Sequence, residues 1–308
     1  MAAKKSTEPG TESAASLHLP VLLEEILDLL QVVPDEDYID GTVGLGGHAE
    51  AILQRSSPEG RLIGIDRDRD TLKLAEDRLK DFGNRFIAQH GSYDQTPALL
   101  QARGWKQVQG MILDLGVSSY QLTHPERGFS FLKDSALDMR MDLEEEVTAR
   151  ELLNDLPETK LATIFWEYGE ERFSRRIARA IEHSRQQAPI RTTGELCQIV
   201  SRAVPFSYKK GRIHPATRVF QALRIAVNRE LDILQAFLKQ SPDFIKVGGV
   251  LAVISFHSLE DRIVKNAFRS WKQHFQILTK KPLVASDAEV ERNPRSRSAK
   301  LRAIRRLA

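Results

Sequence analysis

Residues 38–48, Tyr-Ile-Asp-Gly-Thr-Val-Gly-Leu-Gly-Gly-His, decide the fold expected of this chain. A β-prone Tyr-Ile pair leads into Asp40, and Gly44, Gly46 and Gly47 then allow the backbone to turn tightly and to approach a ligand closely. The stretch is therefore predicted to be a buried strand that runs into a glycine-rich turn. A nucleotide-like cofactor is the expected occupant of such a turn.

A second apolar run, residues 60–66, ends in Asp66, 20 positions after Gly46. An acid at this distance binds ribose hydroxyls in dinucleotide-binding folds, and residues 44–49 fit their G-x-G-x-x-G/A fingerprint. An NAD-dependent oxidoreductase is therefore one interpretation, and an ordinary turn between strand and helix is another. Asp40 favours a different cofactor, because an acid ending the first strand is unfavourable beside a pyrophosphate and suits a cation. S-adenosylmethionine carries a sulfonium, an amino group and a ribose, and no phosphate.

Composition excludes several classes of protein. The chain has 308 residues, of which 41% are hydrophobic, enough for a substantial core. No run approaches the roughly 20 apolar residues of a membrane span, so we expect a cytoplasmic protein with no membrane partner. The single cysteine, Cys197, excludes an internal disulfide, and the eight histidines show no metal-ligand spacing, so no metal is expected.

Apolar runs alternate with helical patterns four times within residues 38–115. This alternation predicts an α/β fold with a doubly wound parallel sheet, in which ligands bind beyond the carboxyl ends of the strands. Asp40, Asp66 and Asp114 each follow an apolar run, so all three are expected at that edge. Acids gathered there indicate a functional site rather than coincidence.

The alternation stops after residue 121, and helical patterns follow a long loop. We therefore predict an all-helical insertion between the fourth strand and the following core helix. The predicted domains are a disordered tail (1–16), a core in two pieces (17–121 and 212–308) and the inserted substrate-recognition domain (122–211).

The sheet is expected to resume after the insertion. Residues 215–238 carry one continuous apolar helical pattern, and residues 250–256 form the expected fifth strand. The last two strands, predicted at 275–279 and 299–304, are expected to pair antiparallel.

Eight blocks occur in order along the chain: YIDGTVGLGGH (38–48), DLGVSSYQL (114–122), RGFSF (127–131), LDMRMD (137–142), YGEERF (168–173), HPATRVFQALRI (214–225), SFHSLEDR (255–262) and NPRSRS (293–298). On these blocks the chain resembles the ribosomal RNA small subunit methyltransferase H family. The resemblance implies a class I, Rossmann-like methyltransferase. It also implies S-adenosylmethionine-dependent methylation of the exocyclic N4 of a decoding-centre cytidine in small-subunit (16S) ribosomal RNA. The expected partner is that RNA, within the small ribosomal subunit, and a homodimer is left open.

The same resemblance implies the cofactor contacts, which are Gly46, Gly47, His48, Asp66, Tyr93, Asp114 and Gln121. Two departures from wider patterns stand out. Thr42 replaces the first glycine of the general class I loop. The sequence DLGV at 114–117 differs from the Asp-Pro-Pro-aromatic motif of many amino-group methyltransferases, so the mechanism of that group is not transferred unchanged.

The chemistry assigns roles to some of these residues. Asp66 is expected to accept both ribose hydroxyls, since a carboxylate is a bidentate acceptor. Tyr93 either stacks on adenine or covers the end of the third strand. The cytosine amine is a poor nucleophile, and an acceptor such as Asp114 or a backbone carbonyl would favour a pyramidal nitrogen. Asp114 is thus the candidate catalytic residue, with positioning supplying much of the acceleration.

Candidate substrate-binding residues come from three segments. A flipped base needs apolar walls, so Phe129 and Phe131 are candidates, although they equally suit anchoring of their loop. Arg218 and Arg224 lie on one polar helix stripe and suit phosphate and base contacts, or a solvated face. His257, beyond the fifth strand, lies where substrate should approach, but a structural role is also open.

A cationic stripe of Arg172, Arg176, Arg179 and His183 recurs at helical spacing in the insertion. It predicts either an RNA-tracking surface or a solvated helix face. A non-catalytic RNA-binding factor for ribosome assembly is therefore a second alternative beside the oxidoreductase.

Overall fold

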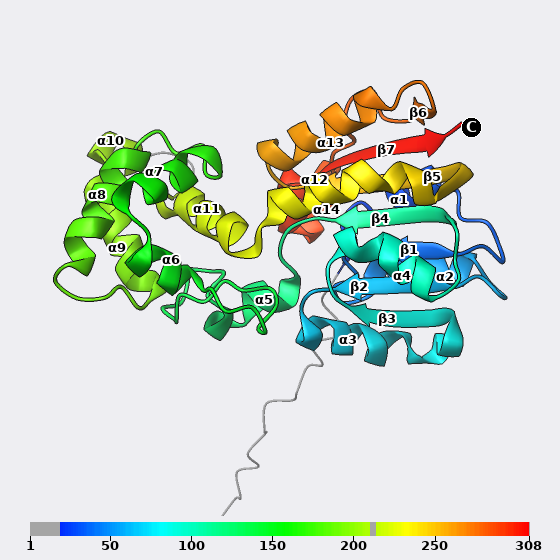
Figure 1. The fold of residues 1–308 in the computed structure, drawn as a ribbon, viewed down its shortest axis with the longest axis horizontal. Helices are drawn as coiled ribbons and strands as arrows, with labels where there is room; N and C mark the ends of the chain where they lie inside the picture. Colours follow the sequence, from blue (N-terminus) through cyan, green and yellow to red (C-terminus); the bar gives the residue numbers. More distant parts are fainter. Residues whose placement is uncertain (1–18, 210–213, 308) are drawn as a thin grey trace, which may run out of the picture.

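The computed structural model describes residues 19–209 and 214–307, so the predicted tail and the predicted boundary at 211/212 lie outside the described residues. A seven-stranded sheet of order β3-β2-β1-β4-β5-β7-β6 forms the centre (Figure 1). Its strands are β1 (Tyr38–Asp40), β2 (Leu62–Asp66), β3 (Phe86–His90), β4 (Val108–Asp114), β5 (Ile245–Ser255), β6 (Phe275–Ile277) and β7 (Lys300–Arg306). Strands β1 to β5 are parallel, and β7 runs antiparallel to β5 and to β6. The predicted α/β sheet and its antiparallel last pair are confirmed.

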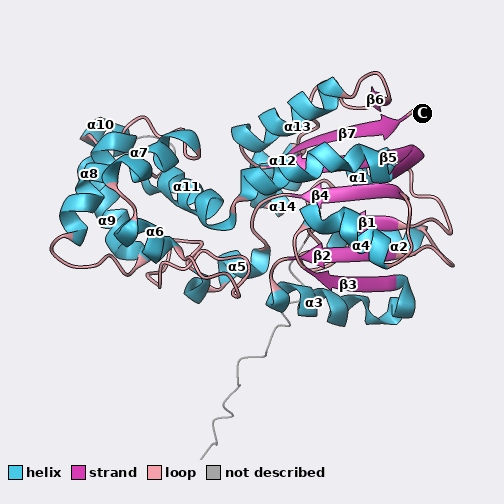
Figure 2. Ribbon diagram, in the orientation of Figure 1, coloured by secondary structure: helices cyan, strands magenta, loops and turns pink. Residues whose placement is uncertain are grey.

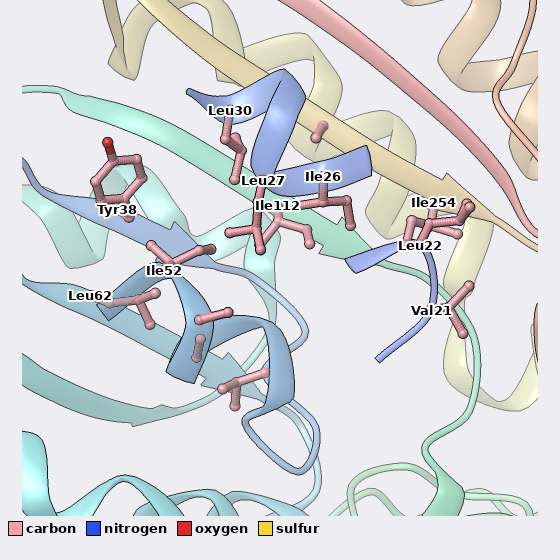
Figure 3. Close-up of a cluster of buried hydrophobic side chains, with 14 of the residues drawn as sticks. Val21, Leu22, Ile26, Leu27, Leu30, Tyr38, Ile52, Leu62, Ile112 and Ile254 are labelled. Carbon is pink, nitrogen blue, oxygen red and sulfur yellow. The ribbon is translucent and has the colours of Figure 1, made fainter. Parts of the chain in front are cut away.

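Helices cover both faces of the sheet, as Figure 2 shows. One face carries α1 (Leu23–Leu30), α2 (Gly47–Arg55) and α3 (Arg69–Leu79), and the other carries α4 (Thr96–Ala102), α12 (Glu230–Gln240) and α13 (Ser258–Ser270). Side chains alternate between the faces along each strand, so Tyr38 packs with α1 in Figure 3 whereas Ile39 packs on the opposite face. Burial on both faces explains the continuous apolar runs in the sequence.

A second group of helices lies to one side of the sheet (Figure 1). These helices are α6 (Ala149–Asp155), α7 (Glu158–Glu167), α8 (Ser174–Arg185), α9 (Thr193–Ala203), α10 (Phe206–Lys209) and α11 (Ala216–Asn228). A core of its own, containing Leu153, Phe165, Ile177 and Leu196, holds the group together. The chain reaches it through the short helix α5 (Ser119–Thr123) and a long loop. The predicted insertion falls on this group, and its exact limits stay a prediction.

The prediction of a single helix over residues 215–238 is wrong, because two helices meet at Arg229. Arg229 has a φ of 51°, a left-handed conformation that ends α11 and starts α12. Side chains of α11 such as Leu223 pack among the helical group, whereas Phe237 of α12 packs on the sheet. One straight helix cannot serve both cores, and neither glycine nor proline marks the break.

Asn228 secures this junction, and its replacement by alanine is expected to destabilise the fold. It is 1% exposed, its Nδ2 donates to the Met139 carbonyl at 2.7 Å, and its Oδ1 accepts from the Met141 N–H at 2.7 Å. The alanine variant leaves these buried groups unpaired, so we expect the free energy of unfolding to fall by about 2–3 kcal/mol. Urea titration measures this fall, and Gln101→Ala on the exposed side of α4 is the control. An unchanged unfolding midpoint for Asn228→Ala would contradict it.

None of the helices that the structure describes is both long and apolar enough to span a bilayer.

Candidate functional site

A cavity of about 310 Å³ opens beyond the carboxyl ends of β1, β2 and β4, within the size range of small-molecule sites. The glycine turn after β1 forms its floor, and Asp66 and Tyr93 follow from β2 and β3. Residues 114–119, 121 and 122 at and after the end of β4, the start of α12 and Phe256 after β5 also line it. The cavity therefore lies where parallel sheets bind ligands.

The glycine turn and the acid at the end of β2 form one hydrogen-bonded unit. The Gly44 N–H donates to Asp66 Oδ2 at 2.9 Å, and the Asp68 N–H donates to Asp66 Oδ1 at 2.9 Å. Gly44 and Gly46 have φ angles of 53° and 81°, which disfavour any other residue. A Cβ on Gly47 would lie 2.7 Å from Pro20 Cγ, so this backbone is closely covered. The turn therefore offers the cavity a backbone without side chains at its glycines, and hydrogen bonds hold Asp66 beside it.

Three acids lie along the strand ends, and of these Asp40 is buried whereas Asp66 and Asp114 are half-buried. Burial raises the pKa of Asp40 to about 7, of Asp66 to about 6 and of Asp114 to about 8. The negative charges of Asp40 and Glu260 raise the pKa of Asp114 further. Asp114 Oδ1 is buried with no hydrogen-bond partner among the described residues. A buried acceptor without a partner is stabilised by a donor from a ligand. A cationic ligand would also lower the raised pKa values of the three acids.

At another wall of the cavity Arg224 forms an ion pair with Glu230, and His257 lies against Glu260. Arg224 Nε donates to Glu230 Oε1 at 2.9 Å, and its Nη2 donates to Glu230 Oε2 at 3.0 Å. Glu260 accepts from the Phe256 N–H at 2.8 Å, and His257 Nε2 lies 3.1 Å from its Oε1. Burial raises the pKa of Glu260, but His257 and Arg224 outweigh it and lower that pKa below the usual value. This wall combines a fixed guanidinium, an ionised carboxylate and the Phe256 ring.

Residues 15–307 match the model of the MraW methylase family. The chain belongs to the MraW methylase family. It is 50% identical to the ribosomal RNA small subunit methyltransferase H of Syntrophotalea carbinolica, over 94% of this chain and 98% of that protein. The enzyme of the same name from Picosynechococcus sp. is 51% identical over 92% and 95% of the two chains. An rRNA methylase structure from Streptococcus thermophilus is 10% identical and aligns over 94% of this chain and 99% of its own, at a TM-score of 0.46.

Most residues expected to contact the cofactor of this methylase lie around the cavity. Its lining includes Gly47, His48, Asp66, Tyr93, Asp114 and Gln121, together with Arg224 from the substrate candidates. Gly46 caps α2 and is not part of the lining. Gln121 Nε2 donates to Asp68 Oδ2 at 2.9 Å, and this bond ties the segment after β4 to the start of α3. These contacts with the cofactor remain predictions.

The other substrate candidates lie outside the cavity lining. Phe129 and Phe131 pack against the core of the helical group, which agrees with the anchoring alternative. Arg218 donates to the Glu170 carbonyl at 2.7 Å, and His257 pairs with Glu260. Roles for Phe129, Arg218 and His257 in RNA binding would therefore need contacts beyond the cavity.

Phe256, Glu230, Glu260 and Arg295 line the cavity and were not among the candidates. Phe256 directly follows β5 and Asp114 is the last residue of β4, so the strand-end rule that selected the acids would also have selected Phe256. The other three have no comparable signal, because helix and loop packing brings them to the cavity.

Among the residues that the structure describes, two groups of side chains have the mutual distances of a metal site: His90, Asp142 and Glu144, and Glu230, His257 and Glu260. The second borders the cavity, but Glu230 already accepts two bonds from Arg224. A guanidinium in that position repels a cation. We therefore assign no metal to it.

The raised pKa of Asp40 makes stability depend on pH. Between the ordinary value of 3.8 and about 7, folded protein keeps a proton that unfolded chain has lost, so stability falls as pH rises through this window. Asp40→Asn removes the titration. We expect its stability relative to wild type to improve by about 2 kcal/mol between pH 5 and pH 8. Urea unfolding of cofactor-free protein at both pH values measures this, and a pH-independent difference would contradict it.

Proposed function

We propose that this methyltransferase transfers a methyl group from S-adenosylmethionine to the exocyclic N4 of a cytidine in small-subunit (16S) ribosomal RNA. Membership of the methylase family supports the reaction class and the cofactor. The observation that best supports the proposal is Asp114, which lines the cavity and whose buried Oδ1 has no hydrogen-bond partner among the described residues. The specific nucleotide rests on the family resemblance of the sequence.

The residues of the cavity suit the cofactor. When bound, S-adenosylmethionine supplies an activated methyl group on a sulfonium. Asp66 has lone pairs left after accepting from Gly44 and Asp68, and these would accept the ribose hydroxyls. Asp114 lines the cavity, and buried Asp40 ends the neighbouring strand β1 close enough to raise the pKa of Asp114, so acidic groups would lie near the positive end of the ligand. A pyrophosphate would instead meet these acids, which disfavours the NAD-dependent alternative.

Asp114 would orient the target amine and receive its proton. Its pKa of about 8 means that the free cavity holds it mostly protonated at neutral pH. A nearby cationic ligand favours the ionised form and lowers that pKa. Ionised Asp114 accepts a hydrogen bond from the amine, and after methyl transfer it accepts the proton that the nitrogen releases. In this role Asp114 acts mainly once the cofactor site is filled.

The second wall would hold the base. Phe256 offers an apolar surface of the kind that flipped bases stack against, and Arg224 offers fixed donors. Phe129, Arg218 and His257 remain candidates for contacts with the surrounding RNA. On α8, the exposed Arg176, Arg179 and His183 would follow the phosphate backbone.

Action on the assembled small subunit, a cytoplasmic location and a homodimer belong to the same proposal. Ribosomal subunits are the substrate expected from the resemblance, and they are assembled in the bacterial cytoplasm. Gel filtration with light scattering tests the dimer.

Transfer of labelled methyl from S-adenosylmethionine to small subunits that lack the modification tests the proposal. We expect nucleoside analysis to find N4-methylcytidine with wild type and none with Asp66→Ala. Protein-free 16S RNA in parallel shows whether the assembled subunit is required. A different methylated nucleoside would overturn the target, and RNA binding without any transfer would favour the assembly-factor alternative. Fluorescence titration with nicotinamide nucleotides tests the oxidoreductase.

A further inference from the structure

The connection between β6 and β7 lies beside the cofactor cavity. It contains α14 (Asp287–Arg292) and the short 3₁₀ helix η6 (Pro294–Ser298). Because β7 is antiparallel to β5, its first residue, Lys300, pairs with Ser255 at the carboxyl end of β5. The preceding connection therefore comes to the ligand-binding edge of the sheet, although it is more than 200 residues after the glycine turn in the sequence.

The segment before α1 joins this connection to the glycine turn. Glu289 Oε1 accepts from the Leu22 N–H at 2.8 Å, and Asn293 Nδ2 donates to the Leu19 carbonyl at 3.0 Å. Between these two anchors, Pro20 and Val21 line the cavity. Two chain segments distant in sequence are thus fastened together across one side of the cofactor site.

Arg295 projects from this fastened segment into the lining of the cavity, where it donates to Ser119 Oγ. No carboxylate lies within 4.0 Å of its guanidinium in the part of the chain that the structure describes. The other two arginines of the lining are paired, Arg67 with Glu145 at 3.6 Å and Arg224 with Glu230 at 2.9 Å. Partial burial lowers the pKa of Arg295, so an anion would stabilise its charge.

We propose that Arg295 binds the carboxylate of the methionine part of S-adenosylmethionine. The inference rests on the proposed cofactor. That carboxylate is the only anionic group of the ligand, and the acids at the strand ends, Asp40, Asp66 and Asp114, offer it no positive charge. Arg295 is the cation at the rim without a carboxylate partner, and an arginine recognises a carboxylate through paired N–H donors. The acids and Arg295 together would fix the direction in which the cofactor lies.

Calorimetric titration of the full chain with S-adenosylmethionine and with its decarboxylated form isolates this contact, because the two ligands differ only in the carboxylate. We expect Arg295→Ala to raise the Kd of S-adenosylmethionine by roughly tenfold or more, the loss of a charge-assisted pair. The Kd of the decarboxylated ligand should change by less than about twofold, since this ligand has no carboxylate to pair with Arg295 in wild type or to lose in the variant. Arg295→Lys should recover part of the loss. Arg297→Ala, an exposed arginine of the same 3₁₀ helix, is the matched control and should bind both ligands as wild type does.

Equal losses for both ligands would overturn the proposal, because Arg295 would then act through the shape of the loop. Unchanged affinity of Arg295→Ala for both ligands would also overturn the proposal. If the KM for RNA then rose and RNA binding depended less on salt, Arg295 would be assigned to an RNA phosphate. The two calorimetric titrations require no methyl transfer. A wrong RNA target would therefore leave the binding result intact.

Discussion

Replacing Asp66 with alanine is expected to weaken S-adenosylmethionine binding by about 100-fold or more. Two hydrogen bonds from a ribose to one carboxylate, at about 1.5–3 kcal/mol each, exceed the roughly 2.7 kcal/mol that this factor represents. The same carboxylate holds the turn, because Gly44 and Asp68 donate to its two oxygens at 2.9 Å. The alanine variant therefore loses a ligand contact and also loosens the backbone that the ligand lies against.

Calorimetric titration with S-adenosylhomocysteine measures the loss without turnover. Asp77→Ala, an exposed acid on α3, removes a similar charge outside the cavity and should bind as wild type does. Asp66→Asn keeps the size of the side chain and one acceptor oxygen, so we expect an intermediate affinity. Wild-type affinity in a folded Asp66→Ala protein would contradict the ribose assignment.

The sequence predicted the parts of the cavity that depend on local pattern. Asp66 and Asp114 each end an apolar run, and strand polarity alone brings such residues to one edge of a parallel sheet. The glycine turn was equally visible, because its positive φ angles require glycine. These features could be predicted because each is encoded within one strand and the turn that follows it.

The parts that the sequence did not predict depend on contacts between distant segments. Arg229 takes a left-handed conformation with no glycine to mark it, because two cores compete for α11 and α12. Phe129 suited either a wall of the base pocket or anchoring of its loop, and it packs on the helical group, whereas Phe256 lies in the cavity lining. Arg295 reaches the lining only through the reversed strand β7. The periodicity of apolar residues along the sequence does not report such contacts between distant segments.

Replacing Asp114 with asparagine is expected to lower kcat by roughly 10²–10³-fold while S-adenosylmethionine affinity near pH 6.5 changes little. Because the pKa of Asp114 is about 8, the free cavity holds it mostly neutral at that pH, and asparagine imitates the neutral form. The amide cannot receive the proton of the target amine. Asp114→Asn therefore keeps cofactor binding and loses turnover, whereas Asp66→Ala loses both.

The pH dependence distinguishes this role from a structural one. A cationic ligand binds the ionised acid better, so wild-type affinity for S-adenosylmethionine should rise as pH increases from about 6 to 8. In Asp114→Asn the affinity for S-adenosylmethionine should rise less over this pH range, because the ionisation of Asp114 no longer contributes to it. S-adenosylhomocysteine, whose sulfur is neutral, should show a weaker rise, and the exposed Asp243→Asn should behave as wild type. If Asp114→Asn turned over at the wild-type rate, a backbone carbonyl rather than this carboxylate would have to orient the amine.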